Sequence, residues 1–426
     1  MSAPADEPAP PVAAATAPSP RSLITVIAAG IFVTGFAWPG ILGRLPFNLL
    51  LKNQLHLPAL SVSRFWAVAT LAWYFKPLVG FVCDAYPLFG TRRRGYLLVG
   101  TLLTGLCWLT FAVVPRNYLT FMVVMTALNL AMVAVSTVVG GLQVEVSQRY
   151  GATGRLASLR TGLEGVMNLA GGPISGFLAV CAFGWTTLTG ALVMFSFLPV
   201  VTCFYREPRG ARTNTAVWAT ARSHLKTIVG SRAMWGATGL LFLVYLAPGF
   251  QTPMFYYQQD VLKLDPRFMG FLQLLGGAGG IIGAAIYGYL CRRLPLKVSL
   301  LAGILLNAAS TLLYLRYDSA RSAALIDTSA ALLGTLATLP IYDLAARATP
   351  AGSESFGFAL MMSIRNVAIF AISDPFGSYL YDRYHIGFKQ LVWLNAGSSA
   401  VVLFFVPLLP AALLAAREES RPAAGS

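Results

Sequence analysis

WYFKPLVGFVCDAYPLFGTRRRGY, the stretch from Trp73 to Tyr96, decides the fold. It opens as an apolar run that carries Lys76, it reaches Asp84, and the arginine triplet Arg92–Arg94 follows. A charge among apolar residues is expensive in lipid, so it normally faces a protein interior or a wet cavity. Arginines gather at the cytoplasmic ends of membrane helices. This segment therefore predicts a membrane span, its orientation and a candidate functional charge.

The whole chain has the composition of a membrane protein. Of its 426 residues, 56% are apolar and 11% are charged, whereas soluble domains carry roughly 25% charged residues. Apolar runs of about 20 residues, long enough to cross a bilayer core, recur between residues 23 and 415. Backbone in lipid must satisfy its hydrogen bonds internally, and the short alternating segments of a β-barrel are not found. We expect an all-α polytopic membrane protein.

The net charge of +15 does not indicate a nucleic-acid partner. The basic residues cluster in short loops between apolar runs, and their excess on one set of loops predicts both termini on the cytoplasmic side of a bacterial inner membrane. The five cysteines form no CxxC pair and the three histidines are isolated, so we predict no metal site and no cofactor. Hydrolase, protease and nucleotide-binding motifs are not found, so we do not expect an enzyme.

Twelve membrane spans are predicted, six on either side of the longest connection. We expect a disordered tail (1–20), an N-terminal six-helix bundle (21–204), a cytoplasmic linker (205–232), a C-terminal six-helix bundle (233–416) and a second tail (417–426). The predicted spans cover residues 23–43, 61–83, 96–114, 118–146, 156–182, 186–204, 233–256, 268–290, 298–316, 322–346, 355–380 and 389–415.

The two halves resemble each other in sequence. WPGILGRLPFNLLLKNQ, which contains Pro39, matches APGFQTPMFYYQQD, which contains Pro248, at an offset of 209. GFVCD matches GYLCR at an offset of 208, and SLRTG at Ser158 matches SIRNV at Ser363 at an offset of 205. Three matches in one order at a nearly constant offset indicate internal duplication. Parallel six-helix repeats are the architecture of the major facilitators, with the substrate site between the halves near the midplane.

Each half begins with a span that contains a Pro-Gly pair. Pro39 and Pro248 remove helix hydrogen bonds and the adjacent glycines loosen the turn, so both spans should bend or open in their outer halves. Interrupted helices at matched places in a repeat indicate a binding site or a gate. The alternative is a kink that only helps packing.

Arg160 and Arg365 are matched by the repeat. Arg365 should lie near the midplane with no acid one helical turn away, so we expect it to bind a distant partner or a ligand anion. Glu164 follows Arg160 by one turn, so these two can pair, and the pair could be purely structural. Glu164 and Asp374 are candidate proton carriers, because a desolvated carboxyl group takes up a proton more readily.

Charges at the inner rim are candidate gates. Acids and bases there can latch the two halves together in one state and release them in another. Lys76, beside Pro77, either faces a cavity or gate or extends its stem toward the inner surface. The candidate latch residues are Asp84, Arg92, Arg93, Arg94, Glu145 and Asp343.

KPLVGFVCDAYPLFGTRRRGY resembles the signature of the folate–biopterin transporter family, a branch of the major facilitators. It is similar to the general facilitator loop motif, whose positions are filled here by Gly80, Asp84, Gly90, Arg92 and Arg93. The resemblance implies a carrier of folates, pterins or similar anions that is coupled to protons or works by exchange.

The fourth span departs from that pattern. The family often carries acids there ahead of a Val-Glu pair. This chain keeps Val144 and Glu145 but presents Ser136 and Gly140 in place of the acids.

We expect a monomeric secondary transporter that works by alternating access and moves an organic anion such as a folate or pterin. Arg365, Arg160 and Lys76 would hold its carboxylates, since a guanidinium presents paired donors to a carboxylate. The rings of Phe250, Tyr256 and Tyr257 could stack on a flat ligand. Two alternatives stay open: an efflux carrier for amphiphilic drugs or metabolites, and a facilitator-like protein that serves as a receptor or assembly factor.

Overall fold

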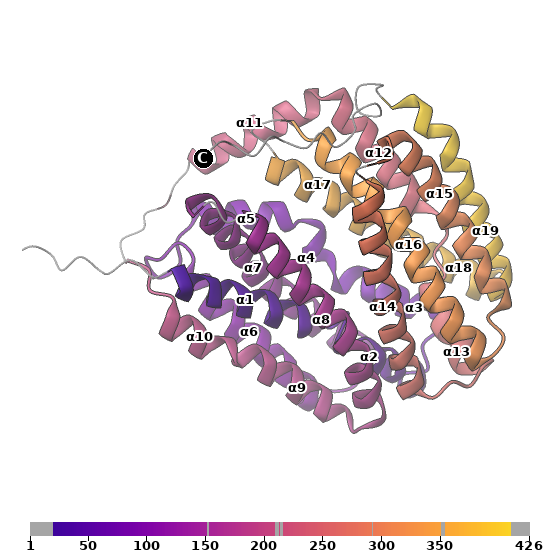
Figure 1. The fold of residues 1–426 in the computed structure, drawn as a ribbon. Coiled ribbons are helices and arrows are strands. Elements are labelled where there is room, and N and C mark those ends of the chain that lie inside the picture. Colours follow the sequence, from indigo (N-terminus) through magenta and orange to yellow (C-terminus); the bar gives the residue numbers. More distant parts are fainter. Residues whose placement is uncertain are drawn as a thin grey trace, which may run out of the picture.

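The computed structural model describes residues 20–150, 153–208, 213, 216–291, 293–350 and 354–409. All regular elements in that part of the chain are helices (Figure 1). The predicted tails, 1–20 and 417–426, lie outside the described residues except for Pro20, where the first helix begins.

The helices form two groups along the chain, separated by α11 (Ala216–Gly230) in the predicted linker. The N-terminal group consists of α1 (Pro20–Phe36), α2 (Arg44–Leu49), the π-helix η1 (Leu50–Gln54), α3 (Ala59–Ala69), α4 (Leu71–Tyr74), α5 (Lys76–Ala85), α6 (Arg94–Val113), α7 (Tyr118–Arg149), α8 (Thr153–Val180), α9 (Phe183–Phe195) and α10 (Phe197–Phe204). The C-terminal group consists of α12 (Arg232–Leu246), α13 (Gln251–Asp260), α14 (Pro266–Leu290), α15 (Leu296–Leu312), η2 (Leu313–Arg316), α16 (Ala320–Ala348), α17 (Glu354–Asn366), the π-helix η3 (Val367–Ser373), α18 (Asp374–Arg383), α19 (Phe388–Val401) and η4 (Val402–Leu408).

An apolar helical segment lies at each of the twelve predicted spans. Ten segments of the described residues are long and apolar enough to cross a membrane, and two apolar helices, α1 and α3, are shorter. They are short because the structure interrupts the first two spans: α1 stops at Phe36, and the second span is divided at Thr70 and Phe75. The all-helical membrane fold is confirmed, with ten rather than twelve segments of full spanning length.

The first span of each half is interrupted where its Pro-Gly pair predicts. Pro39 lies in the irregular segment between α1 and Arg44, where α2 begins. Pro248 lies between Leu246, where α12 ends, and the start of α13. A proline has no N–H for the helix ladder and its ring collides with the preceding turn, which favours an interruption where glycine follows it, although α8 and α16 continue through Pro173 and Pro340.

One large apolar cluster fills the N-terminal half and continues into α13, α14, α16 and α19 of the C-terminal half. In the N-terminal half, Phe47 is fully buried at the centre of an aromatic cluster, with ring centres 4.9 Å from Phe111 and 5.1 Å from Phe183. In the C-terminal half, a separate cluster includes Leu241, Leu300 and other residues of α12, α15, α16 and α17. The first cluster therefore joins the two halves, while the second contains residues of α11 and of the C-terminal half.

The halves meet along α8 with α14 and along α3 with α18 (Figure 1). Glycines line the first of these contacts. A Cβ at Gly176 would lie 2.8 Å from the carbonyl oxygen of Pro266, and one at Gly172 would lie 2.7 Å from the Cβ of Gln273. Small residues let membrane helices approach closely without a hydrophobic driving force, so these glycines bring the two backbones together.

Gly377 marks a close approach between α18 and the interruption before α13. A Cβ at Gly377 would overlap the carbonyl oxygen of Gly249, and one at Gly249 would lie 2.8 Å from the Cα of Asp374. The eleventh span therefore packs backbone to backbone against the broken seventh span.

We predict that Gly377→Ala lowers the thermal unfolding temperature of the purified protein. The added methyl group has no room, and overpacking of this kind costs about 1–3 kcal/mol. Gly397→Ala is the matched control on α19, since nothing lies within 4 Å of its added Cβ. Equal unfolding temperatures for the two variants would contradict the packing described here.

Candidate functional site

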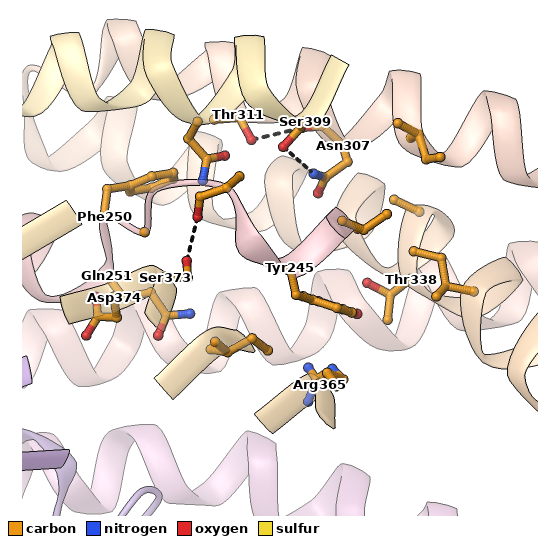
Figure 2. A pocket seen from close by; sticks show the side chains of 18 residues that line it. Tyr245, Phe250, Gln251, Asn307, Thr311, Thr338, Arg365, Ser373, Asp374 and Ser399 are labelled. Carbon is orange, nitrogen blue, oxygen red and sulfur yellow. Dashed lines mark hydrogen bonds between the residues drawn. The ribbon is translucent and has the colours of Figure 1, made fainter. Parts of the chain in front are cut away.

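A cavity of about 270 Å³ lies among the C-terminal helices (Figure 2). The sequence predicted a site between the two halves, whereas this cavity is lined by C-terminal elements: α12, α13, α15, α16, α19 and the interrupted span 354–383. Its polar and aromatic lining consists of Tyr245, Phe250, Gln251, Asn307, Thr311, Thr338, Arg365, Ser373, Asp374, Asn395 and Ser399.

Arg365, near the end of α17, contributes the positive charge of the cavity wall. Its guanidinium carbon lies 4.6 Å from the ring centre of Tyr245 and 5.8 Å from that of Tyr342. Nη1 donates to the side chain of Asn366 at 3.4 Å, while Nε is buried without a hydrogen-bond partner among the described residues. Ring faces attract a cation but do not neutralise it. Arg365 thus has aromatic neighbours in place of an acid, and its charge remains available to an anion.

Asp374, the first residue of α18, holds the interrupted seventh span. Its Oδ1 accepts from the backbone N–H of Thr252 at 2.9 Å, and its Oδ2 accepts from the Thr252 hydroxyl at 2.6 Å. The neighbouring Ser373 donates its hydroxyl to the carbonyl of Ala247 at 2.6 Å (Figure 2). Its backbone carbonyl accepts from the N–H of Gly249 at 2.8 Å. Both carboxylate oxygens are therefore occupied at the start of α13, although the sequence suggested a proton carrier.

A second polar cluster lies in the N-terminal half. The ammonium of Lys76, at the start of α5, donates to the Ser136 hydroxyl of α7 at 3.0 Å. On α8, Arg160 donates to Glu164 at 2.8 Å, as predicted from their spacing, and to Gln143 of α7 at 3.3 Å. Arg160 and Glu164 both interact electrostatically with Lys76. Three spans thus bring two cations and one carboxylate together, which leaves a net positive charge.

The two polar regions belong to neighbouring elements. α17, which carries Arg365, packs against α4 and α5, and α5 carries Lys76. Two of the cations predicted to bind substrate, Arg365 and Lys76, therefore lie on elements that meet across the contact between the halves.

The three predicted ring-stacking residues have different surroundings. Phe250 lines the cavity. Tyr257 already stacks on Phe388, with ring centres 4.6 Å apart. Tyr256 donates its hydroxyl to the carbonyl of Leu57 in the other half. Of the three, Phe250 is the one that lies along the cavity.

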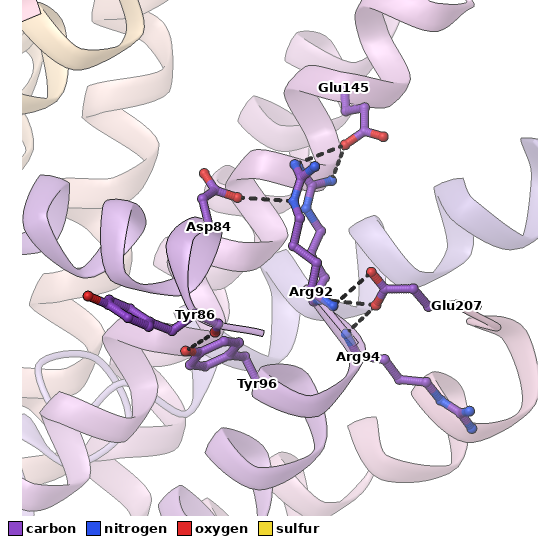
Figure 3. A network of polar contacts seen from close by, with 8 residues as sticks. Asp84, Tyr86, Arg92, Arg94, Tyr96, Glu145 and Glu207 are labelled. Carbon is purple, nitrogen blue, oxygen red and sulfur yellow. Dashed lines mark hydrogen bonds and ion pairs between the residues drawn. The ribbon is translucent and has the colours of Figure 1, made fainter. Parts of the chain in front are cut away.

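The inner-rim charges form an ion-pair network (Figure 3). Arg92 pairs with Asp84 at 3.3 Å, and the nearly buried Arg93 pairs with Glu145 at 2.5 Å. The sequence predicted a latch between the two halves. In this structure these pairs join α5, the loop before α6 and α7, which all belong to the N-terminal half.

Glu207, which the sequence reading missed, completes this network. It follows α10, and its carboxylate accepts from the backbone N–H groups of residues 92–94, with the shortest bond, 2.8 Å, to Arg94 (Figure 3). An acid suits the positive end of a helix, so Glu207 ties the sixth span to the start of α6. In the C-terminal half, Asp343 pairs with Arg347 on its own helix at 2.8 Å, not with the other half.

The direct polar contacts between the halves that involve charged side chains of the described residues lie at the outer rim. Lys52 of η1 forms an ion pair with Asp260 at the end of α13. Asp382 of α18 accepts from the backbone N–H of Leu60 at 2.6 Å, at the start of α3. The sequence held a usable signal for the first pair: Lys52 and Asp260 are 208 positions apart, like the matched motifs.

The chain matches known proteins over most of its length. The model of the BT1 family matches residues 39–422. A "Folate-biopterin transporter" of Synechocystis sp. is 27% identical over 398 residues, which cover 87% of this chain and 78% of that protein. "Folate transporter 2" of Plasmodium falciparum is 24% identical over 395 residues, which cover 87% and 84%. The resemblance to the folate–biopterin transporters is thereby confirmed.

Solved structures share the fold. A peptide transporter POT in complex with sulfate superposes with a TM-score of 0.72 at 13% identity, covering 93% of this chain and 95% of that one. A D-xylose-proton symporter gives a TM-score of 0.69 at 14% identity, covering 91% and 97%. The fold is that of the major facilitators, and the protein is a membrane transporter rather than an enzyme. By the extent of the family match, the chain belongs to the BT1 family.

Proposed function

We propose that this protein carries an organic anion, a folate or pterin, across a bacterial cytoplasmic membrane by alternating access. In this proposal the carrier is a monomer with both termini in the cytoplasm, and it couples transport to protons or exchanges one anion for another. The observation that carries the proposal is Arg365, a cation on the wall of a polar cavity without an acid partner among the described residues. The names of the relatives, a folate-biopterin and a folate transporter, support the choice of anion.

The chemistry of the cavity suits one part of such a ligand. A folate has a flat heteroaromatic ring at one end and carboxylates at the other. The cavity of about 270 Å³ is slightly smaller than the ~300–1,000 Å³ usual for small-molecule sites, so it suits the ring rather than the whole molecule. The amides of Asn307 and Asn395 and the hydroxyl of Thr338 line it and offer donors and acceptors to ring nitrogens and oxygens. Phe250 offers a face for stacking.

The carboxylates of the ligand would bind to the cations. Arg365 has a buried Nε–H that lacks a partner, and a buried donor gains most from an acceptor that arrives with the ligand. Lys76 lies on α5 beside α17, and Arg160 interacts electrostatically with Lys76, so these two cations form the second positively charged region. We propose that the anion bridges the two regions, so that binding draws the halves together. Glu164 and Asp374 are the proton-coupling candidates that the sequence offers to this proposal, and the inner-rim charges keep their gating role in it.

The outer rim supplies the gate for the state described here. Lys52 with Asp260, and Asp382 with the start of α3, hold the two halves together at that side. Exposed ion pairs contribute little stability, about 0–1 kcal/mol each. Contacts of this strength can break and reform in a transport cycle, as alternating access requires.

We predict that Arg365→Gln reduces uptake of radiolabelled folate into proteoliposomes about ten- to a hundredfold, because a hydrogen bond to a charged group contributes ~1.5–3 kcal/mol. Arg365→Lys keeps the charge but loses the paired donors, so its uptake rate should lie between those of the wild type and Arg365→Gln. Arg383→Gln, at the exposed end of α18, is the control. Wild-type uptake by Arg365→Gln would remove this residue from the site, and export of folate from loaded cells would favour the efflux alternative.

For the outer gate we predict a charge-swap rescue. Lys52→Glu and Asp260→Lys should each slow uptake, because like charges then face each other across the rim. The double variant restores the pair and should recover most of the rate. The exposed pair Lys389–Asp318, at 2.6 Å, lies within the C-terminal half, so the corresponding reversal there should have little effect. Rates in the double variant as low as in the single ones would contradict a gating role.

A further inference from the structure

Asp327 on α16 is a buried acid that takes no part in the site described so far. Its side chain is 9% exposed. Its Oδ2 accepts from the hydroxyl of Tyr317 at 2.9 Å, and Tyr317 is itself fully buried. The other carboxylate oxygen, Oδ1, is buried without a hydrogen-bond partner among the described residues.

The surroundings of Asp327 hold no compensating cation. Two tyrosines, Tyr314 and Tyr317, interact with its carboxyl group, and the facing residue of α14 at this level is Gly276. The other charged groups on the elements around it are Arg267 at the start of α14, Lys297 at the inner end of α15, Arg316 at the end of η2 and Asp260 at the end of α13, and on α16 itself the exposed Arg321 near its start and the paired Asp343 and Arg347 near its far end. The ion pairs of the described residues do not include Asp327.

A carboxylate buried in this way is costly while it is ionised. Without a cation or a full set of donors, the desolvation cost of the charge is not offset. Adding a proton removes the charge and converts the free oxygen into an O–H group. In a membrane span, an ionisable residue of this kind is a functional candidate by default.

The two acids first considered for proton coupling differ from Asp327. Glu164 is about half exposed and paired with Arg160, so its charge is already stabilised. Asp374 accepts bonds on both oxygens from Thr252, and protonation would disturb the start of α13. Asp327 can accept a proton on its free oxygen without losing the bond from Tyr317.

A short chain of contacts connects Asp327 to the outer gate. Gln258 of α13 donates to the hydroxyl oxygen of Tyr317 at 2.7 Å, and Tyr317 donates to Asp327. The neighbours of Gln258 on the same helix, Tyr256 and Asp260, contact Leu57 and Lys52 of the other half. The bond from Tyr317 is charge-assisted while Asp327 is ionised, and such bonds are roughly twice as strong as neutral ones. Protonation of Asp327 therefore weakens the hydrogen-bonded connection between α16 and α13, the helix that carries the outer-rim contacts.

We propose that Asp327 is the residue that binds the coupled proton, and that Tyr317 and Gln258 transmit its charge state to the outer gate. This inference rests on the proposed function, in its proton-coupled form. When α13 moves away at the outer rim, water reaches the carboxylate and a proton adds to Oδ1. Release of that proton to water at a later stage restores the carboxylate, so that the step balances without any further reactant.

The first test measures coupling in proteoliposomes with radiolabelled folate. The uptake rate with an inward proton gradient is divided by the rate without one, and counterflow, in which no net proton moves, is measured in parallel. Asp327→Asn mimics the neutral acid and cannot titrate. We expect its gradient ratio to fall to one while counterflow stays within about twofold of the wild-type rate. Asp327→Glu, which restores a titrating group, should recover a ratio above one.

Asp318→Asn is the matched control. Asp318 is an exposed acid beside Tyr317 and pairs with Lys389 at the surface, so this variant should keep the wild-type ratio. A gradient ratio unchanged by Asp327→Asn would overturn the proposal. An equal loss in Asp318→Asn would do the same, because the effect would then not be specific to the buried acid.

A second readout needs no substrate and separates this inference from the proposed function. Infrared difference spectra of the purified protein, recorded during a pH titration in heavy water, report the carbonyl band of protonated carboxyl groups. We expect one band of the wild type to be missing in Asp327→Asn, and its midpoint to shift in Tyr317→Phe. If the wild type moves no folate in either mode, the proposed function fails while this titration still decides the role of Asp327. Identical titrations in wild type and Asp327→Asn would refute the role of Asp327. If Asp327→Asn does not fold, an unshifted midpoint in both Asp327→Glu and Tyr317→Phe would refute that role.

Discussion

The interruption of the seventh span, between α12 and α13, is the feature on which the cavity depends. A membrane supplies no hydrogen bonds to backbone groups freed by a broken helix, so the protein must supply them. Ser373 and Asp374 of the eleventh span serve the two helix ends, and Asn395 of α19 donates to the carbonyl of Pro248 at 2.9 Å. These side chains also line the cavity. The repair of the helix and the wall of the site are thus built from the same groups.

This constraint explains which parts of the site could be predicted. A Pro-Gly pair acts on its own helix, so the interruptions at Pro39 and Pro248 were predictable from sequence. The absence of an acid within one helical turn of Arg365 can also be read directly from the sequence. The partner of Asp374 is not local, because Thr252 lies 122 positions away. Sequence identifies Asp374 as an acid in an apolar run, but the donors around it depend on how two helices are rotated toward each other, and the orphaned oxygen of Asp327 was missed for the same reason.

The gates show the same division. At the inner rim, a tight turn with positive φ at Phe89 and Gly90 folds the loop back, so Arg92 and Arg93 find Asp84 and Glu145 within their own half. Residue type and rim were predictable, but the partner was not. At the outer rim, the sequence analysis used lysines and arginines only to assign topology. That use does not identify their ion-pair partners. The repeat offset is the one sequence property that relates Lys52 to Asp260.

The duplicated arginines have diverged in a way that assigns the two halves different tasks. Arg160 is already paired with Glu164 one turn along the same helix. Arg365 faces the rings of Tyr245 and Tyr342, which leave its charge in place. An uncompensated buried charge destabilises the empty protein, and an anion that enters the cavity relieves that cost. In the proposed function, Arg365 therefore responds most strongly to the presence of the anion, whereas Arg160 already has Glu164 as a partner.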